Sequence, residues 1–264
     1  DGRCSEALSE VGSFPTEVRA GRLSEKLDAA GESVEEHFTR LGDVEKHPLV
    51  ALNTAFFEDA AFIEIPERVV VDEPIHVVFL SSAGHPDRAS HPRVFIRAGR
   101  DSQATLIESY LALGHQPYWT NPVTEIVAGE NARVEHYKLQ QESTQAWHTG
   151  IVYVRQHRDS NFVSHSLSFG GRLVRADYRV LLADQGCECT LNGLYAVKDS
   201  RHVDHHTTID HAHPHCHSHQ LYKGVLDDRS TAVFNGKILV REDAQKTDAF
   251  QSNKNLLLSE NAGV

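Results

Sequence analysis

The chain has 264 residues, a hydrophobic content of 40% and a net charge of −11 at neutral pH. This length suits one large folded core, and the acidic balance argues against a general nucleic-acid binder, because recognition of phosphates needs a basic surface. We therefore expect no nucleic-acid partner. No apolar run reaches the ~18 residues that cross a bilayer, so we also expect no membrane segment.

The first region, residues 1–60, carries helical signals separated by loops. Ser33 is followed by Glu36 at the spacing of a capping box, and residues 47–57 carry leucine, alanine and phenylalanine at near-helical intervals. We therefore expect two or three short helices here, leading into a second region, residues 61–264.

The second region has the composition of many short strands. Runs of Val, Ile, Thr, Phe and Tyr alternate with polar turns that contain Gly, Asp or Asn. The turn at residues 98–102 is echoed 30 residues later at 128–131, and its Arg-Asp-Ser segment returns at residues 158–160. A repeat of two strands and two corners predicts a stacked array in which each unit buries its apolar face against the next. Periodicity by itself leaves a β-sandwich as the alternative.

Histidines are concentrated near the C-terminal end, with eight of the 18 between residues 202 and 219. Five of them alternate with other residues: His211, His213, His215, His217 and His219. An extended strand would point all five to one side, with Cys216 facing the other way. Since imidazole and thiolate are ligands for zinc, iron and copper, we name His211, His213, His215 and Cys216 as candidate metal ligands. The alternative is an exposed polar strand, which Pro214 would confine to the edge of a sheet.

The cysteines and the catalytic motifs give weaker indications. Cys187-Glu188-Cys189 would place two thiols on one face of a strand, where they could receive sulfur or iron. We favour the other interpretation, in which both cysteines are small side chains buried in the core. The sequence has neither a Gly-x-Ser-x-Gly elbow nor a phosphate-binding glycine loop. We expect neither nucleophilic catalysis nor binding of a nucleotide through those motifs.

Several blocks of the second region resemble the SufB/SufD family of iron–sulfur cluster assembly scaffolds, in the order found in that family. They are residues 188–195, 202–211, 214–216, 221–224, 232–238 and 245–258. Residues 53–59 and the compact spacing are more similar to the SufD branch. The resemblance implies a mainly β fold, a right-handed parallel β-helix (solenoid) with short N-terminal helices. It also implies that the family's N-terminal helical domain and a C-terminal segment that binds SufC are missing from this sequence.

The function implied by the resemblance is that of a non-catalytic scaffold subunit of the SUF iron–sulfur cluster assembly system. Its partners would be SufB and the ATPase SufC, with pairing to a second copy left open, in the cytoplasm or the plastid stroma. We expect no cofactor bound stably by this chain alone, although iron or an iron–sulfur cluster would pass through the complex. Two alternatives are a histidine-rich metal-binding module and a β-helix enzyme that acts on a polysaccharide.

Overall fold

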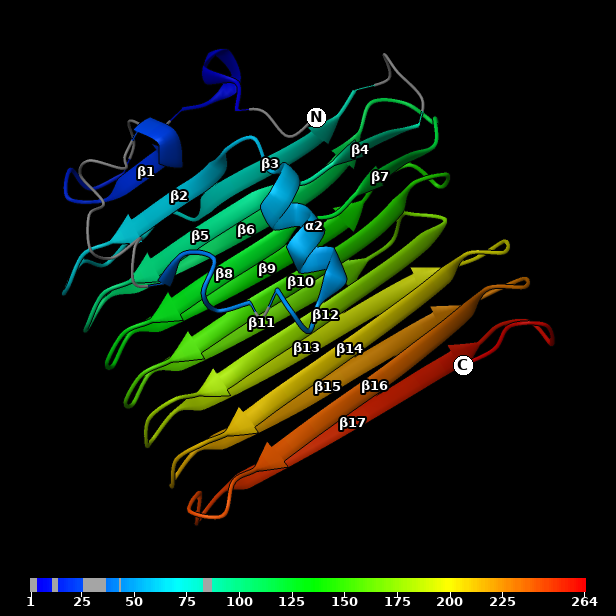
Figure 1. Cartoon of the computed structure of the whole chain (residues 1–264). Helices are drawn as coiled ribbons and strands as arrows, with labels where there is room; N and C mark the ends of the chain where they lie inside the picture. Colours follow the sequence, from blue (N-terminus) through cyan, green and yellow to red (C-terminus); the bar gives the residue numbers. More distant parts are fainter. Residues whose placement is uncertain (1–3, 11–13, 26–36, 43, 83–86) are drawn as a thin grey trace.

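The computed structural model describes residues 4–10, 14–25, 37–42, 44–82 and 87–264. Two parallel sheets face each other, and the chain passes from one to the other at every corner (Figure 1). This arrangement is a right-handed parallel β-helix, as the resemblance implied, and the β-sandwich alternative is wrong.

The first sheet, here called sheet A, has ten strands among the described residues, three of them short. In chain order the ten are β1 (Arg19–Arg22), β2 (Ala60–Ile65), β4 (Arg88–Ser90), β5 (Arg93–Ala98), β7 (Tyr118–Thr120), β8 (Val123–Ala128), β10 (Trp147–Gln156), β12 (Leu173–Leu182), β14 (His202–His211) and β16 (Thr231–Val240).

The second sheet, sheet B, faces sheet A across the core. Its strands are β3 (Ile75–Ser81), β6 (Gln103–Ala112), β9 (Arg133–Gln141), β11 (Asn161–Ser168), β13 (Glu188–Val197), β15 (His217–Leu226) and β17 (Asp248–Leu257).

The register of the strands confirms the repeat seen in the sequence. Glu188 pairs with His217 in sheet B, and His202 pairs with Thr231 in sheet A, so both neighbours lie 29 residues further along the chain. Each coil therefore holds one strand of each sheet and two corners. Because successive coils pair in parallel, each strand covers the edge of the one before it.

One corner of each coil turns through a residue in the left-handed backbone conformation. These residues are Arg68, Asp101, Asn131, Asp159, Gly186, His215 and Lys246. The side chain of the following residue often bonds to the carbonyl three positions before it, as Ser102 does to Gly99 and Ser160 to His157. Backbone hydrogen bonds stack these following residues into one column, here called the corner column: Ser102, Ala132, Ser160, Cys187 and Cys216.

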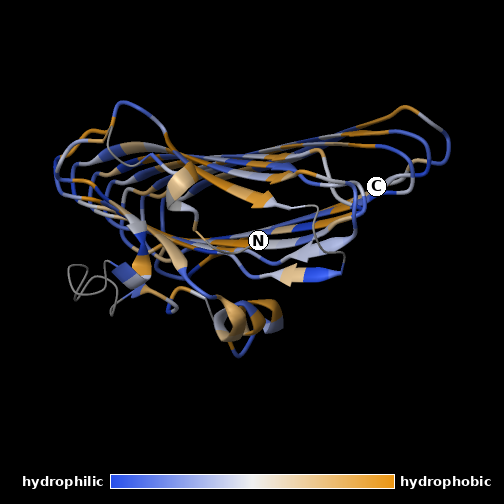
Figure 2. Cartoon of the chain, turned by 90° about the horizontal axis from the view of Figure 1, so that it is seen from above, coloured by the Kyte–Doolittle hydropathy of each residue, from blue (hydrophilic) through white to orange (hydrophobic). Residues whose placement is uncertain are grey.

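The core lies between the sheets and follows from the alternation of side chains along each strand. Every second residue of β14 is buried and the others are half-buried, as expected for a strand with one face inward. Figure 2 shows the two layers from above, with hydrophobic and hydrophilic residues alternating along them. More than half of the residues in the main hydrophobic cluster are valine, isoleucine or tyrosine, whose β-branched or aromatic side chains suit a pleated surface.

The N-terminal elements begin with strand β1, which pairs antiparallel with β2 and forms one edge of sheet A. A 3₁₀ turn spans η1 (Glu6–Leu8), and helix α2 (Pro48–Phe56) confirms the helix predicted over residues 47–57. Figures 1 and 2 show α2 against the outer face of sheet A. The predicted capping box at Ser33 and Glu36 lies outside the described residues, and the division into regions 1–60 and 61–264 stays a prediction.

Buried polar contacts hold α2 in place. The Asn53 amide donates to the carbonyl oxygens of Pro92 and Asn121, each at 2.8 Å. The Arg93 guanidinium bonds to Asn53 and forms a fully buried ion pair of 2.6 Å with Glu125. These contacts tie the helix to two consecutive coils. Neither this helix nor another helix in the described part of the chain is long and apolar enough to span a membrane.

Candidate functional site

The four residues named as metal ligands do not converge. The His211 ring is buried inside the solenoid at the end of β14, with Nε2 2.8 Å from the Ser218 hydroxyl. His213 and His215 are exposed in the turn that follows, and Cys216 is buried at the end of that turn. Across the described ranges, no group of three His, Cys, Asp or Glu side chains is arranged to hold a metal ion.

The prediction of one strand carrying five alternating histidines is therefore wrong. Strand β14 ends at His211 and β15 begins at His217, with a turn between them in which His215 has a φ of 61°. His217 and His219 belong to the next strand and are exposed on the outer face of sheet B. At this point the chain turns from sheet A to sheet B. His211 therefore lies inside the solenoid, and the exposed histidines that follow lie in the turn or on the outer face.

The interpretation of Cys187 and Cys189 as buried core side chains is confirmed, since both are shielded from solvent. Cys187 also meets Cys216, because the two lie one coil apart in the corner column. Their sulfur atoms lie 3.1 Å and 3.2 Å from one acceptor, the Asp184 carbonyl oxygen. The neighbouring Cys187 thiol lowers the pKa of Cys216 to about 7, and the nearby Cys216 sulfur, with burial, raises the pKa of Cys187.

A cluster of ionisable side chains inside the solenoid was not predicted from the sequence. Its centre is Glu108 of β6, which accepts hydrogen bonds from Tyr110 at 2.6 Å and from Thr124 at 2.9 Å. Nε2 of His136 lies 2.9 Å from the Glu108 carboxylate. The Lys138 ammonium is 3.9 Å from Glu108, makes no hydrogen bond, and lies 4.7 Å from the centre of the Tyr110 ring.

A second carboxylate, Glu142, continues this cluster toward sheet A. It lies 2.7 Å from Nδ1 of His148 and accepts hydrogen bonds from Thr120 at 2.6 Å and Gln140 at 3.1 Å. Nε2 of His148 has no hydrogen-bond partner, although it is buried. We name the side chains Glu108, His136, Lys138, Glu142 and His148 the interior cluster.

A glycine makes room for the interior cluster. A side chain at Gly150 of β10 would start 2.7 Å from Nε2 of His148 and 3.0 Å from Nζ of Lys138. Both contacts are shorter than van der Waals distance, so the space above Gly150 is already taken by these two nitrogen atoms. The backbone of β10 therefore approaches the cluster more closely than any other residue type would allow.

The electrostatics of the interior cluster keep charges inside the solenoid. Burial by itself raises the pKa of Glu108, but Lys138 and His136 outweigh it and lower that pKa to about 2. Burial likewise raises the pKa of Glu142, and the neighbouring His148 reverses the shift to a net lowering. Burial lowers the pKa of Lys138 against the attraction of both carboxylates. The cluster thus holds two carboxylates in the ionised form next to an amine that releases its proton more easily.

The sequence did contain a signal for the interior cluster. His136 and Lys138 share a strand face with Val134, and that face is inward because Val134 is buried. Polar residues at inward positions of a predicted strand mark either a site or an internal network. Which distant carboxylates they meet is decided by the stacking of coils and cannot be read from one strand.

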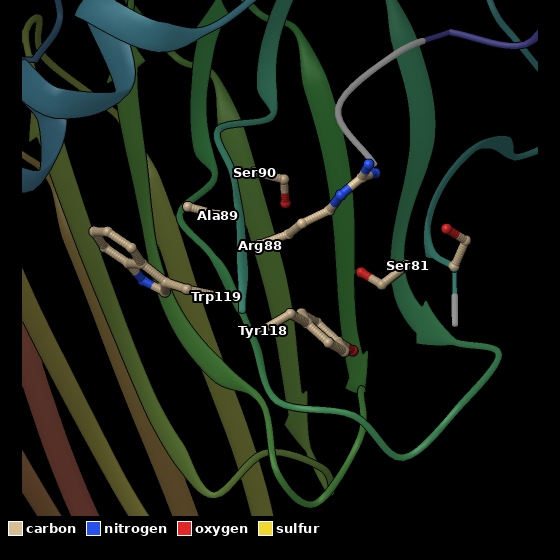
Figure 3. Close-up of a pocket in the computed structure, with 7 residues that line it drawn as sticks. Ser81, Arg88, Ala89, Ser90, Tyr118 and Trp119 are labelled. Carbon is tan, nitrogen blue, oxygen red and sulfur yellow. The ribbon is translucent and has the colours of Figure 1, made fainter. Parts of the chain in front are cut away.

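Figure 3 shows a small hollow at one corner, beside β3, β4 and β7. It is lined by Ser81, Ser82, Arg88, Ala89, Ser90, Tyr118 and Trp119. Its volume of about 30 Å³ matches roughly one water molecule, well below the size of a substrate pocket. The hollow is therefore a crevice between strands.

Strands β16 and β17 are the last strands of the two sheets among the described residues. Val240 of β16 pairs with buried His211 on the preceding coil, and Leu257 of β17 pairs with buried Leu226. At the other end, β1 covers the edge of β2 in sheet A. We call the surface formed by β16 and β17 the end face.

Comparison with known proteins places these features in a family. Residues 79–264 match the SUF system FeS cluster assembly SufBD core domain, and residues 2–77 match the SufBD protein N-terminal region. We expected the family's N-terminal helical domain to be absent, whereas its N-terminal region is matched in this sequence.

Individual relatives agree with this match. The chain is 33% identical over 81% of its length to an iron–sulfur cluster assembly SufBD family protein of Synechocystis, covering 49% of that protein. It is 29% identical over its full length to the chloroplastic protein ABCI7 of Arabidopsis thaliana, covering 57%. It is 26% identical over 92% of its length to the iron–sulfur cluster assembly protein SufD of Escherichia coli, covering 58%. The chain thus spans about half to three fifths of these relatives.

Proposed function

This chain belongs to the SufB/SufD family, and from that membership we propose that it is a scaffold subunit of the SUF iron–sulfur cluster assembly system. We further propose that it has no catalytic centre of its own and acts by presenting a surface to partner subunits. The observation that carries the proposal is the family match over residues 2–77 and 79–264, which leaves almost no part of the chain outside it.

We propose that the end face is the partner surface, because a partner of the same fold can extend a parallel β-helix by adding coils to its last strands. Parallel strands β16 and β17 offer backbone donors and acceptors on which a partner of the same fold can continue both sheets. Such a partner would contact the side chains of Val240 and Leu257, which continue inward-facing columns of the solenoid.

The proposed partners are SufB, as the subunit of the same fold, and SufC, as the ATPase. The sequence carries no phosphate-binding glycine loop, which fits a subunit that depends on another for ATP. Iron and sulfide would be the cargo of the assembled complex and not a resident cofactor of this chain. Relatives from bacteria and from a chloroplast make the cytoplasm or the plastid stroma the proposed location.

The proposal predicts a complex that depends on the end face. A full-length version of the chain, co-expressed with SufB and SufC, should co-purify with both, and the complex should develop cluster absorbance when supplied anaerobically with iron and sulfide. Leu257→Asp places a charge in the end face and should reduce recovery of SufB about tenfold, a loss of roughly 1.4 kcal/mol of binding free energy. The amount of each subunit is measured by quantitative gel analysis.

The matched control is Leu113→Asp, because Leu113 is 67% exposed and lies far from β16 and β17 in the chain. It should leave SufB recovery unchanged. If Leu257→Asp recovers as much SufB as the wild type does, the end face is not the partner surface. Light scattering would then show whether the end face joins two copies of this chain instead. No complex with either partner and no cluster absorbance would reject the scaffold proposal itself.

A further inference from the structure

Cys187 and Cys216 occupy the same position in two consecutive coils. The residues that follow them, Glu188 and His217, are paired partners in sheet B. Both sulfur atoms lie within 3.2 Å of the Asp184 carbonyl oxygen, so the two thiols meet at one acceptor. Both side chains are fully buried, so the pair is held beneath the corner.

The corner itself does not need sulfur at these positions. Ser102 and Ser160 stand earlier in the corner column, and each hydroxyl donates to the carbonyl oxygen three residues before it, at 2.6 Å. Cys187 makes the same contact to Asp184 at 3.1 Å. A serine would close the turn equally well, so the two sulfur atoms add a chemistry that the fold does not require.

We propose that Cys187 and Cys216 form a redox-active dithiol that a peroxide oxidises to an intrachain disulfide between consecutive coils. Neighbouring parallel strands lie about 4.8 Å apart, which falls within the roughly 4.4–6.8 Å between α-carbons that a disulfide bridges. The shared Asp184 carbonyl already holds the two sulfur atoms next to each other. This proposal does not depend on the scaffold function or on the end face.

The reaction balances with one peroxide for each pair. The Cys216 thiolate attacks a peroxide oxygen, the O–O bond breaks, and Cys216 becomes a sulfenic acid while hydroxide leaves. The Cys187 sulfur then attacks the Cys216 sulfur, forming the S–S bond and releasing the second oxygen as water. The pair loses two electrons and two protons in total, and the peroxide is reduced to two molecules of water.

The disulfide would join the coil of β13 to the coil of β15 at their shared corner. His213 and His215 are exposed in the turn that leads to Cys216, so local opening of this turn, without separation of the sheets, would admit a small oxidant. The bond would prevent these two coils from separating.

The test is mapping of the oxidised chain. The reduced protein is treated with one equivalent of hydrogen peroxide, remaining thiols are alkylated in denaturant, and peptides are identified by mass spectrometry. We expect a peptide linked through Cys187 and Cys216, a fall in titratable thiols from four to two, and recovery of all four with dithiothreitol. Cys216→Ser, which the corner column should accommodate, should abolish the linked peptide.

Cys189→Ser is the matched control, because Cys189 is buried in β13, two residues after Cys187, and does not belong to the corner column. It should keep the linked peptide at the wild-type amount. Oxidation of exposed Cys4 without any link between Cys187 and Cys216 would overturn the proposal. A link from Cys216 to Cys189 instead would overturn it as well.

Discussion

His205 lies inside the solenoid between two tyrosines, and neither of its ring nitrogens has a hydrogen-bond partner. The centre of its ring is 5.2 Å from that of Tyr195 and 5.4 Å from that of Tyr222. Burial, with a smaller contribution from His206, lowers its pKa from 6.5 to about 3. The folded chain therefore keeps this ring neutral in conditions under which the unfolded chain binds a proton.

This shift predicts a loss of stability in mild acid. Because the pKa of His205 is lower in the folded chain than in the unfolded chain, this group does not reduce the free energy of unfolding above pH 6.5. As the pH falls from 6.5 toward 3, the free energy of unfolding decreases by up to about 1.4 kcal/mol per pH unit. We compare the free energy of unfolding of His205→Phe with that of the wild type. This difference should be about 2 kcal/mol more favourable to the variant at pH 5 than at pH 7.5. Urea unfolding at both pH values measures this difference.

His213→Phe is the control for the pH experiment, since His213 is exposed in a turn. It should follow the pH dependence of the wild type. If His205→Phe also follows the wild type, the buried ring does not carry the acid sensitivity.

At the scale of single elements, large and small residues alternate between neighbouring strands. Gly193 of β13 pairs with Tyr222 of β15, and two positions further along Tyr195 pairs with Gly224. A side chain added at Gly193 would start 2.1 Å from the Tyr222 ring. Each tyrosine thus fills the space left by a glycine on the adjacent coil, which allows both tyrosine rings to fit in a narrow core.

Gly193→Ala should consequently destabilise the chain by about 1–3 kcal/mol through overpacking, and Tyr222→Leu added to it should recover part of the loss. Gly263→Ala is the control, because the nearest atom to its new side chain would be 3.8 Å away. Urea midpoints compare the variants. A Gly193→Ala midpoint equal to that of the wild type would contradict this account of the packing.

At the scale of the whole molecule, a solenoid transmits contacts only between adjacent coils, so its ends are less stable than its centre. Strand β11 is covered on both edges by β9 and β13, whereas β17 pairs with β15 on one edge among the described residues. Amide exchange should therefore be slower in β11 than in β17.

Hydrogen exchange also tests the end face independently of co-purification. Binding of SufB should slow exchange in residues 231–257 at least severalfold while leaving β3, near the other end, unchanged. Mass spectrometry of the free and bound chain measures both segments. Protection of β3 with no change in β17 would place the partner at the opposite end.

The sequence by itself determined the elements that depend on near neighbours. The strands, the helix at α2 and the coil repeat are all properties of residues close together in the chain, where inward alternation and turn residues specify them. The corner turns repeat because each coil needs one left-handed residue followed by a small side chain. The family blocks then indicated that the repeats form a β-helix.

Only the tertiary structure decided what the side chains meet. The histidines from His211 to His219 have the spacing of one strand, but the turn at His215 divides them, so the predicted row never forms. Conversely, Glu108 and Lys138, or Cys187 and Cys216, are distant in sequence and come together because one coil stacks on the next. Inside a solenoid, contacts are made between coils about 29 residues apart, and no local pattern of residues records which side chain will be the neighbour.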